Sequence, residues 1–129
     1  MFKVIIAGTR TFEDYDFLCR YADKKLSQIV GGVEIVSGGA RGADALGERY
    51  ARDRGYDLKV FPADWNRYGK RAGYLRNRQM AEYADALLAF WDGRSRGTRN
   101  MIDEAIARGL KVGVKIYEKR KDEKLSEDG

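Results

Sequence analysis

The sequence predicts an α/β domain in which a mostly parallel, five-stranded sheet carries helices on both faces. Short apolar runs alternate along the chain with longer segments whose apolar residues have helical spacing, a pattern typical of successive βαβ units. Glycine and arginine directly follow three of the apolar runs. The chain has 129 residues, a length that suits one domain of this class.

The first half of the sequence predicts strands at residues 4–7, 34–36 and 58–61, and helices at residues 14–30 and about 45–54. The strands are apolar runs bounded by polar residues or glycine. The first helix presents Leu18, Ala22, Leu26 and Ile29 on one face, and Asp14 is placed to act as its N-cap. Glycine follows both helices and is expected to end them.

The second half predicts helices at residues 74–83 and 98–108, and strands at residues 86–91 and 112–117. A connection of about a dozen residues, from 62 to 73, separates the third strand from the next helix. Loops of this length in compact domains are functional or disordered, and the aromatic residues Trp65 and Tyr68 argue against disorder. We therefore expect this connection to form a lid or wall of a pocket.

Right-handed crossovers between parallel strands leave few arrangements of this sheet. We expect the Rossmann-like order 3-2-1-4-5, with the switch point between the first and fourth strands. Ligands of such sheets bind outside the carboxyl ends of the strands. Three glycine-containing loops, at Gly8, Gly38 and Gly93, follow strands and therefore meet at that edge.

The loop at residues 37–44 carries the strongest functional signal. Its glycines permit a tight turn and a close approach to another molecule, and the following helix offers unpaired amides and the positive end of its dipole. Arg41 adds a permanent cation. The loop predicts a phosphate site made of Ser37, Gly38, Gly39, Ala40, Arg41, Gly42 and Asp44. For Asp44 two interpretations stay open, a helix cap or dipole partner and a contact with a ribose hydroxyl or a backbone amide.

Two further loops have similar chemistry. Gly8-Thr9-Arg10 follows the first strand, and a loop at residues 92–98 follows the fourth. Ser95 and Thr98 are also suited to be N-caps. Of Phe90 and Trp91, which alternate at the strand end, one is expected in the core and the other is available to stack on a base. The ligand contacts predicted from these loops and from neighbouring segments are Gly8, Thr9, Arg10, Trp65, Arg76, Asn77, Gly93, Ser95, Gly97 and Thr98.

The formal net charge is +5, and residues 118–129 hold four basic and five acidic residues, so residues 1–117 carry +6. We expect residues 1–117 to form the domain and residues 118–129 to be a charged, flexible tail. Seven arginines fall in or just after loops on one edge, namely Arg10, Arg41, Arg67, Arg71, Arg94, Arg96 and Arg99. Such a basic edge favours a phosphorylated ligand and permits contact with a nucleic-acid backbone.

Composition excludes several classes of chemistry. The chain has no histidine and one cysteine, which excludes His-dependent nucleophile activation and the usual zinc sites. No resident metal is predicted, and Mg²⁺ held by carboxylates and substrate phosphates is expected only if the protein is an enzyme. The sequence shows neither an apolar run of about 20 residues nor a signal-peptide pattern. We expect a cytoplasmic protein without membrane contact, and exposed helix faces suggest a homo-oligomer.

These motifs together resemble the YspA/YpsA-like branch of the SLOG superfamily. The similarity rests on Gly8-Thr9-Arg10, on residues 37–44 and 61–65, on Gly69-Lys70 and Arg76-Asn77, and on residues 92–98, and it runs from about residue 2 to residue 116. The superfamily includes the LOG phosphoribohydrolases and the DNA-processing protein DprA. The resemblance implies a Rossmann-like domain that binds a nucleotide or a nucleotide-derived ligand.

Two departures limit what the resemblance implies. LOG enzymes carry a Pro-Gly-Gly-x-Gly-Thr-x-x-Glu motif with a catalytic glutamate. When that motif is aligned on Gly97-Thr98, the glutamate position is Met101, which has no acid or base function, and the Pro-Gly-Gly element is absent. DprA resembles the chain in the loop at residues 37–44, and one loop cannot carry over DNA binding that depends on a larger protein.

Three functions remain as hypotheses. The leading hypothesis is a domain that binds or senses a nucleotide-type ligand at the carboxyl edge of the sheet. The second is a nucleotide-processing hydrolase that cleaves an N-glycosidic or phosphoester bond, with Asp44, Asp64 and Asp92 as candidate catalytic carboxylates. The third is an accessory protein that binds nucleic acid through the edge arginines.

Overall fold

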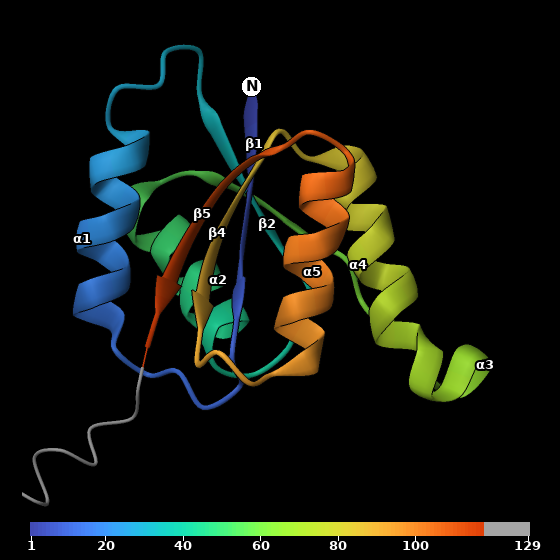
Figure 1. Ribbon diagram of the computed structural model, residues 1–129. Helices are drawn as coiled ribbons and strands as arrows, with labels where there is room; N and C mark the ends of the chain where they lie inside the picture. The colour runs from blue at the N-terminus through green and yellow to red at the C-terminus, as the bar shows by residue number, and fades with distance from the viewer. Residues whose placement is uncertain (118–129) are drawn as a thin grey trace, which may run out of the picture.

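The computed structural model describes residues 1–117. It contains a central sheet with helices packed on its two faces (Figure 1). The tail predicted at residues 118–129 lies outside the described residues.

The sheet has five strands, β1 (Phe2–Gly8), β2 (Val33–Ser37), β3 (Asp57–Val60), β4 (Ala86–Trp91) and β5 (Lys111–Ile116). All neighbouring strands pair in parallel, and their order is β3-β2-β1-β4-β5. The predicted fold class and strand order are therefore confirmed. β1 pairs with both β2 and β4, so the order of strands reverses at β1. The loops after β1, β2 and β4 all begin at the carboxyl edge of the sheet.

The helices are α1 (Tyr15–Leu26), α2 (Ala43–Arg54), α3 (Trp65–Tyr68), α4 (Ala72–Tyr83) and α5 (Arg96–Ala107), with a 3₁₀ turn η1 (Gly69–Arg71) between α3 and α4. Figure 1 shows α1 on one side of the sheet and α4 and α5 on the other, while α3 projects from the body beyond the N-terminal end of α4. Within residues 1–117 no helix has the length and apolar character that crossing a membrane requires.

The alternation of side chains along the strands creates two cores. Val4 and Ile6 of β1 are buried with Phe90 and α1 and α2 residues on one face. Ile5 and Ala7 are buried on the other face with residues of α4 and α5. A parallel strand covered on both faces must be apolar at every position, which explains the uninterrupted apolar runs of β1 and β4.

The first helix is shorter than predicted. It begins after Asp14, whose side chain accepts a hydrogen bond from the amide of Phe17, as expected of an N-cap, but it ends at Leu26 rather than at residue 30. Leu26 is the last residue of the buried face, and Val30 is 95% exposed. Ile29, which the sequence places on the helical face, packs against the core from the turn that follows α1. The chain then continues to β2 through Gly31 and Gly32, both at positive φ.

Candidate functional site

A cavity of about 410 Å³ lies at the carboxyl edge of the sheet, beside the ends of β2 and β3. Residues from four separate segments form its lining: Arg10, Gly38, Gly39, Ala40, Arg41, Val60, Pro62, Ala63, Trp65 and Arg76. A volume of this size falls within the range of small-molecule sites. The structure thus brings together parts of the first and second predicted loops, the predicted wall and the start of α4.

Three arginines line the cavity, and each comes from a different segment. Arg10 follows β1, Arg41 lies in the loop before α2, and Arg76 extends from α4. Arg76 donates a hydrogen bond from Nη1 to the carbonyl of Gly38 and another from Nε to the side chain of Asn77. These contacts fix the guanidinium in a half-buried position, where its remaining N–H groups are available to an anion.

Glycines allow the first two loops to approach each other closely. Gly42 has φ +73°, and a Cβ there would lie 2.4 Å from the carbonyl oxygens of both Thr9 and Arg10. The amide of Ala43 donates to the carbonyl of Thr9 at 3.3 Å. Only glycine satisfies both the conformation and the spacing, so this residue determines how Arg10 and Arg41 lie relative to each other.

Side chains of the protein itself accept hydrogen bonds from two of the loop amides that the sequence predicts for phosphate binding. The amide of Ala40 donates to Oδ2 of Asp44 at 3.3 Å, and the amide of Gly39 donates to the hydroxyl of Ser37 at 3.0 Å. Ser37 is fully buried and in turn donates to Oε2 of Glu48 at 2.6 Å. The amides of Gly39 and Ala40 are therefore hydrogen-bonded within the chain, and guanidinium groups are the charged donors in the cavity lining.

Asp44 is 5% exposed and lies behind the loop, outside the cavity lining. Burial raises the pKa of Asp44 to about 6, against the opposing effects of the Arg76 charge and the hydrogen bond from the Ala40 amide. Of its two open interpretations, the structure shows contact with a backbone amide. A buried carboxyl with a strongly raised pKa, next to residues that line a cavity, is a feature of functional sites.

Replacing Asp44 with asparagine is expected to stabilise the protein selectively at neutral and higher pH. The pKa of Asp44 is raised in the folded state, so its contribution to stability is fully present below the unfolded pKa and is lost as pH rises through about 6. The stability difference between variant and wild type should shift by ~3 kcal/mol in favour of the variant between pH 4 and pH 8.

Urea unfolding at several pH values measures this difference. The matched control is Asp57→Asn, because Asp57 is an exposed carboxylate at the opposite end of the sheet. A stability difference for Asp44→Asn that stays constant from pH 4 to pH 8 would contradict the prediction.

The part of the lining contributed by the end of β3 and the segment after it is largely apolar. It consists of Val60 at the end of β3, then Pro62 and Ala63, and Trp65 at the start of α3. Asp64 caps α3 by accepting a hydrogen bond from the amide of Arg67 at 3.2 Å. Trp65 is 50% exposed and packs near Gly73 of α4, where an added Cβ would be 3.3 Å from the indole. Trp65 therefore presents an open aromatic surface at the cavity.

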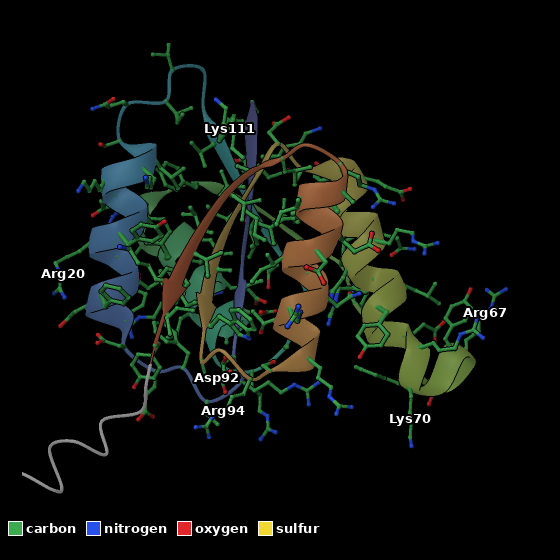
Figure 2. All side chains as sticks on the ribbon, viewed as in Figure 1. Arg20, Arg67, Lys70, Asp92, Arg94 and Lys111 are labelled. Atoms are coloured by element: carbon green, nitrogen blue, oxygen red, sulfur yellow. The ribbon has the colours of Figure 1, made fainter. Side chains whose placement is uncertain are left out.

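The third predicted loop lies at the same edge but does not line the cavity. Asp92 accepts hydrogen bonds from the amides of Arg94 and Ser95, both at 2.8 Å, and its own amide donates to Thr9 at 3.0 Å. Ser95 accepts a hydrogen bond from the amide of Thr98, so it is the N-cap of α5. Figure 2 shows Asp92 and Arg94 at this edge and Lys111 at the opposite end of the sheet.

Asn77 connects this third loop to the cavity. The residue is buried, and its side-chain amide donates to the carbonyl of Gly97 at 3.2 Å and to the side chain of Asn100 at 2.9 Å. Its oxygen accepts from Arg76. Asn77 therefore supports Arg76 from behind and does not line the cavity.

Predicted site residues that are absent from the cavity lining have structural contacts instead. Phe90 is fully buried and Trp91 donates its indole N–H to the carbonyl of Ser95 at 3.0 Å. The residues of the predicted site outside the lining are Gly8, Thr9, Ser37, Gly42, Asp44, Asn77, Gly93, Ser95, Gly97 and Thr98. Val60 lines the cavity but was not among the site residues predicted from the sequence. Its position as the last residue of β3 places it at the carboxyl edge of the sheet and could have identified it.

None of the three candidate catalytic carboxylates lines the cavity. Asp44 holds the second loop, Asp64 caps α3, and Asp92 accepts from two amides of its own turn. Among residues 1–117 no group of three or more histidine, cysteine, aspartate or glutamate side chains is arranged to hold a metal ion.

Comparison with known proteins supports the resemblance found in the sequence. The model of the YspA, cpYpsA-related SLOG family matches residues 2–68, which include both loops that contribute to the cavity and the start of its wall. The chain belongs to this family. The Gene 61 protein of Mycobacterium phage D29 is 39% identical over 118 residues, which are 87% of this SLOG chain and 94% of the phage protein.

Two solved structures share the fold of this SLOG protein. DNA processing protein A (DprA) from Streptococcus pneumoniae superposes with a TM-score of 0.71 at 18% identity, over 100% of this chain and 57% of DprA. Protein TM1055 superposes with a TM-score of 0.63 at 21% identity, over 87% of this chain and 72% of TM1055. At these identities the similarity shows the Rossmann-like fold, and this chain spans little more than half of DprA.

Proposed function

We propose that this SLOG protein binds a nucleotide or a nucleotide-derived phosphorylated ligand in the cavity at the carboxyl edge of its sheet. The observation that carries the proposal is the convergence of Arg10, Arg41 and Arg76 on one cavity whose lining also includes Trp65. Family membership and the fold support a nucleotide-related function.

The cavity lining contains groups suited to both parts of a nucleotide. Guanidinium groups bind phosphate oxygens through paired, charge-assisted hydrogen bonds. The open face of Trp65, beside Pro62 and Ala63, suits stacking with a planar base, which contributes about 1–3 kcal/mol. In this arrangement Arg10, Arg41 and Arg76 hold phosphate while the wall covers the base or the sugar.

Hydrolysis has less support than binding. A general acid or base must reach the proton that it transfers, directly or through one water, and Asp44, Asp64 and Asp92 all lie outside the cavity lining. The position aligned with the LOG glutamate is Met101, which is 1% exposed in the core between β4 and α5. Mg²⁺ would be needed only in this alternative, to assist phosphate chemistry.

Nucleic-acid binding remains a second candidate because further basic residues lie outside the cavity. Figure 2 shows Arg67 on α3, Lys70 on the adjoining turn η1, and Arg94 at the edge of the sheet. The fold similarity to DprA, a DNA processing protein by its name, is compatible with this function. The cavity of about 410 Å³ favours a small ligand, because its volume is in the range of small-molecule sites.

A thermal-shift panel of AMP, ADP, NAD, ADP-ribose and a single-stranded oligonucleotide tests the proposal. A ligand at 100 times its Kd should stabilise the native state by about 2.7 kcal/mol and raise the melting temperature. We expect at least one nucleotide to do so at millimolar concentration, and we expect Arg41→Ala to abolish the shift. The control is Arg20→Ala on α1, far from the cavity (Figure 2).

Two results would contradict the proposal. One is the absence of a shift with every nucleotide, and the other is an equal shift in wild type and Arg41→Ala. A shift with the oligonucleotide alone, which weakens steeply with salt, would favour the nucleic-acid function. Location in the cytoplasm and assembly into a homo-oligomer stay predictions.

A further inference from the structure

The carboxylate of Asp44 contacts the same loop backbone that lines the cavity. Gly38, Gly39 and Ala40 line the cavity, and the amide of Ala40 donates to Oδ2 of Asp44 on the reverse side. A Cβ added to Gly38 would lie 2.8 Å from both Oδ2 of Asp44 and Nη1 of Arg76. The carboxylate is therefore close to any anion in the cavity, with no room for bulk water between them.

The charged groups around Asp44 come from three segments. Arg76 of α4 attracts the carboxylate, and Glu48, one turn further along α2, repels it. Glu48 is held by the hydroxyl of Ser37, the last residue of β2. Arg10, from the loop after β1, repels Arg76 in turn. An ionised Asp44 thus offsets part of the positive charge that faces the cavity, and a neutral Asp44 does not.

We propose that Asp44 is a positioning residue, which holds Arg76 and the loop at residues 38–40 in place and takes up a proton from solvent when an anion enters the cavity. The proposal rests on the proposed function and adds a property to it. A bound anion repels the carboxylate and shares the charge of Arg76, and both effects favour the neutral carboxyl. By reciprocity, a lower pH strengthens anion binding.

The burial of Asp44 places this effect in an accessible pH range. Its pKa of about 6 in the unliganded protein means that the carboxyl is mostly ionised at pH 8 and mostly neutral at pH 5. If a bound anion raises this pKa by one further unit, affinity falls about tenfold across that range.

The test measures the affinity of the full-length protein for ADP-ribose by calorimetry between pH 5 and pH 8. ADP-ribose is the probe because its phosphate diesters do not titrate in this range, unlike a terminal phosphate. We expect about tenfold weaker binding at pH 8 than at pH 5. In two buffers of different ionisation enthalpy at pH 6.5, we also expect net proton uptake on binding.

Three variants separate this effect from a structural role. Asp44→Asn should bind with an affinity that is nearly independent of pH and without proton uptake, while Asp57→Asn, an exposed carboxylate at the far end of the sheet, should behave as wild type. If Asp44→Asn fails to fold, the measurement of proton uptake on binding by the wild type still tests the proposal. Glu48→Gln removes a repulsive charge and should move the affinity transition to lower pH.

Binding of equal strength at pH 5 and pH 8 without proton uptake would overturn the inference and leave the proposed function intact. Persistence of the full pH dependence in Asp44→Asn would also overturn it. Failure of ADP-ribose to bind at any pH would overturn the inference as well, and the nucleotide panel then decides separately whether the cavity takes AMP, ADP or NAD.

Discussion

Replacing Arg76 with alanine is expected to weaken nucleotide binding by about 100-fold and to destabilise the protein more at pH 8 than at pH 5. Hydrogen bonds to a charged group contribute about 1.5–3 kcal/mol each, and a 100-fold loss corresponds to about 2.7 kcal/mol. Arg76 lines the cavity and anchors the carbonyl of Gly38. Its removal also leaves the buried carboxylate of Asp44 without the positive charge that attracts it.

The loss of stability at pH 8 should reach about 3 kcal/mol, because an unpaired buried charge is strongly destabilising. At pH 5 Asp44 accepts a proton and avoids most of this cost. The double variant Arg76→Ala/Asp44→Asn should therefore recover stability at pH 8 but not nucleotide affinity. Urea unfolding and calorimetric titration measure the two quantities separately.

Arg78→Ala is the matched control for Arg76→Ala. Arg78 lies two residues further along α4 and is exposed, so its removal changes the charge of the helix without changing the cavity. We expect both affinity and stability to stay near the wild-type values. Nucleotide affinity in Arg76→Ala within a factor of three of wild type would show that Arg76 does not contact the ligand.

Replacing Gly42 with alanine is expected to destabilise the protein by about 3 kcal/mol or more. The residue has φ +73° and ψ −125°, a conformation essentially restricted to glycine, and such strain costs about 1–3 kcal/mol in other residues. The added Cβ would also lie 2.4 Å from two carbonyl oxygens of the loop after β1. Because these are backbone atoms, the two loops must move apart, which separates Arg10 from Arg41 and weakens binding as well.

Gly97→Ala is the matched control for Gly42→Ala. Gly97 lies in the first turn of α5, and a Cβ there meets no atom within 4 Å. Alanine favours a helix over glycine by up to about 1 kcal/mol, so this variant should be as stable as wild type or slightly more stable. Equal unfolding midpoints for Gly42→Ala and wild type would show that the two loops are not closely packed.

The fold could be predicted almost completely from local patterns. Strand and helix periodicity, with the handedness of crossovers, leads to the order of the five strands. The boundaries were less accurate where burial decides them: α1 ends at Leu26 although the sequence pattern continues to residue 30. The connection after β3 contains α3 and η1, because Asp64 and the packing of Trp65 on Gly73 order a segment without clear periodicity.

The site could be predicted in part. Parallel strands place the loops after β1 and β2 at one edge by topology alone, and Arg10 and Arg41 from these loops both line the cavity. The sequence did not reveal that the third loop is absent from the cavity lining, nor that Asp44 is bonded to the amide of Ala40 in the second loop. These outcomes depend on contacts between residues far apart in sequence, such as the amide of Asp92 with Thr9.

The sequence by itself determined the parallel sheet, its strand order and the edge where arginine-bearing loops gather, because these follow from periodicity and chain chirality. Only the tertiary structure decided which arginines face a common cavity and which carboxylate is buried next to it. Burial and charge depend on the distances between segments, and those distances are set by packing: Gly42 against the loop after β1 and Arg76 against Gly38. Local sequence specifies the residues available for a site, and packing specifies their pKa values and their accessibility to a ligand.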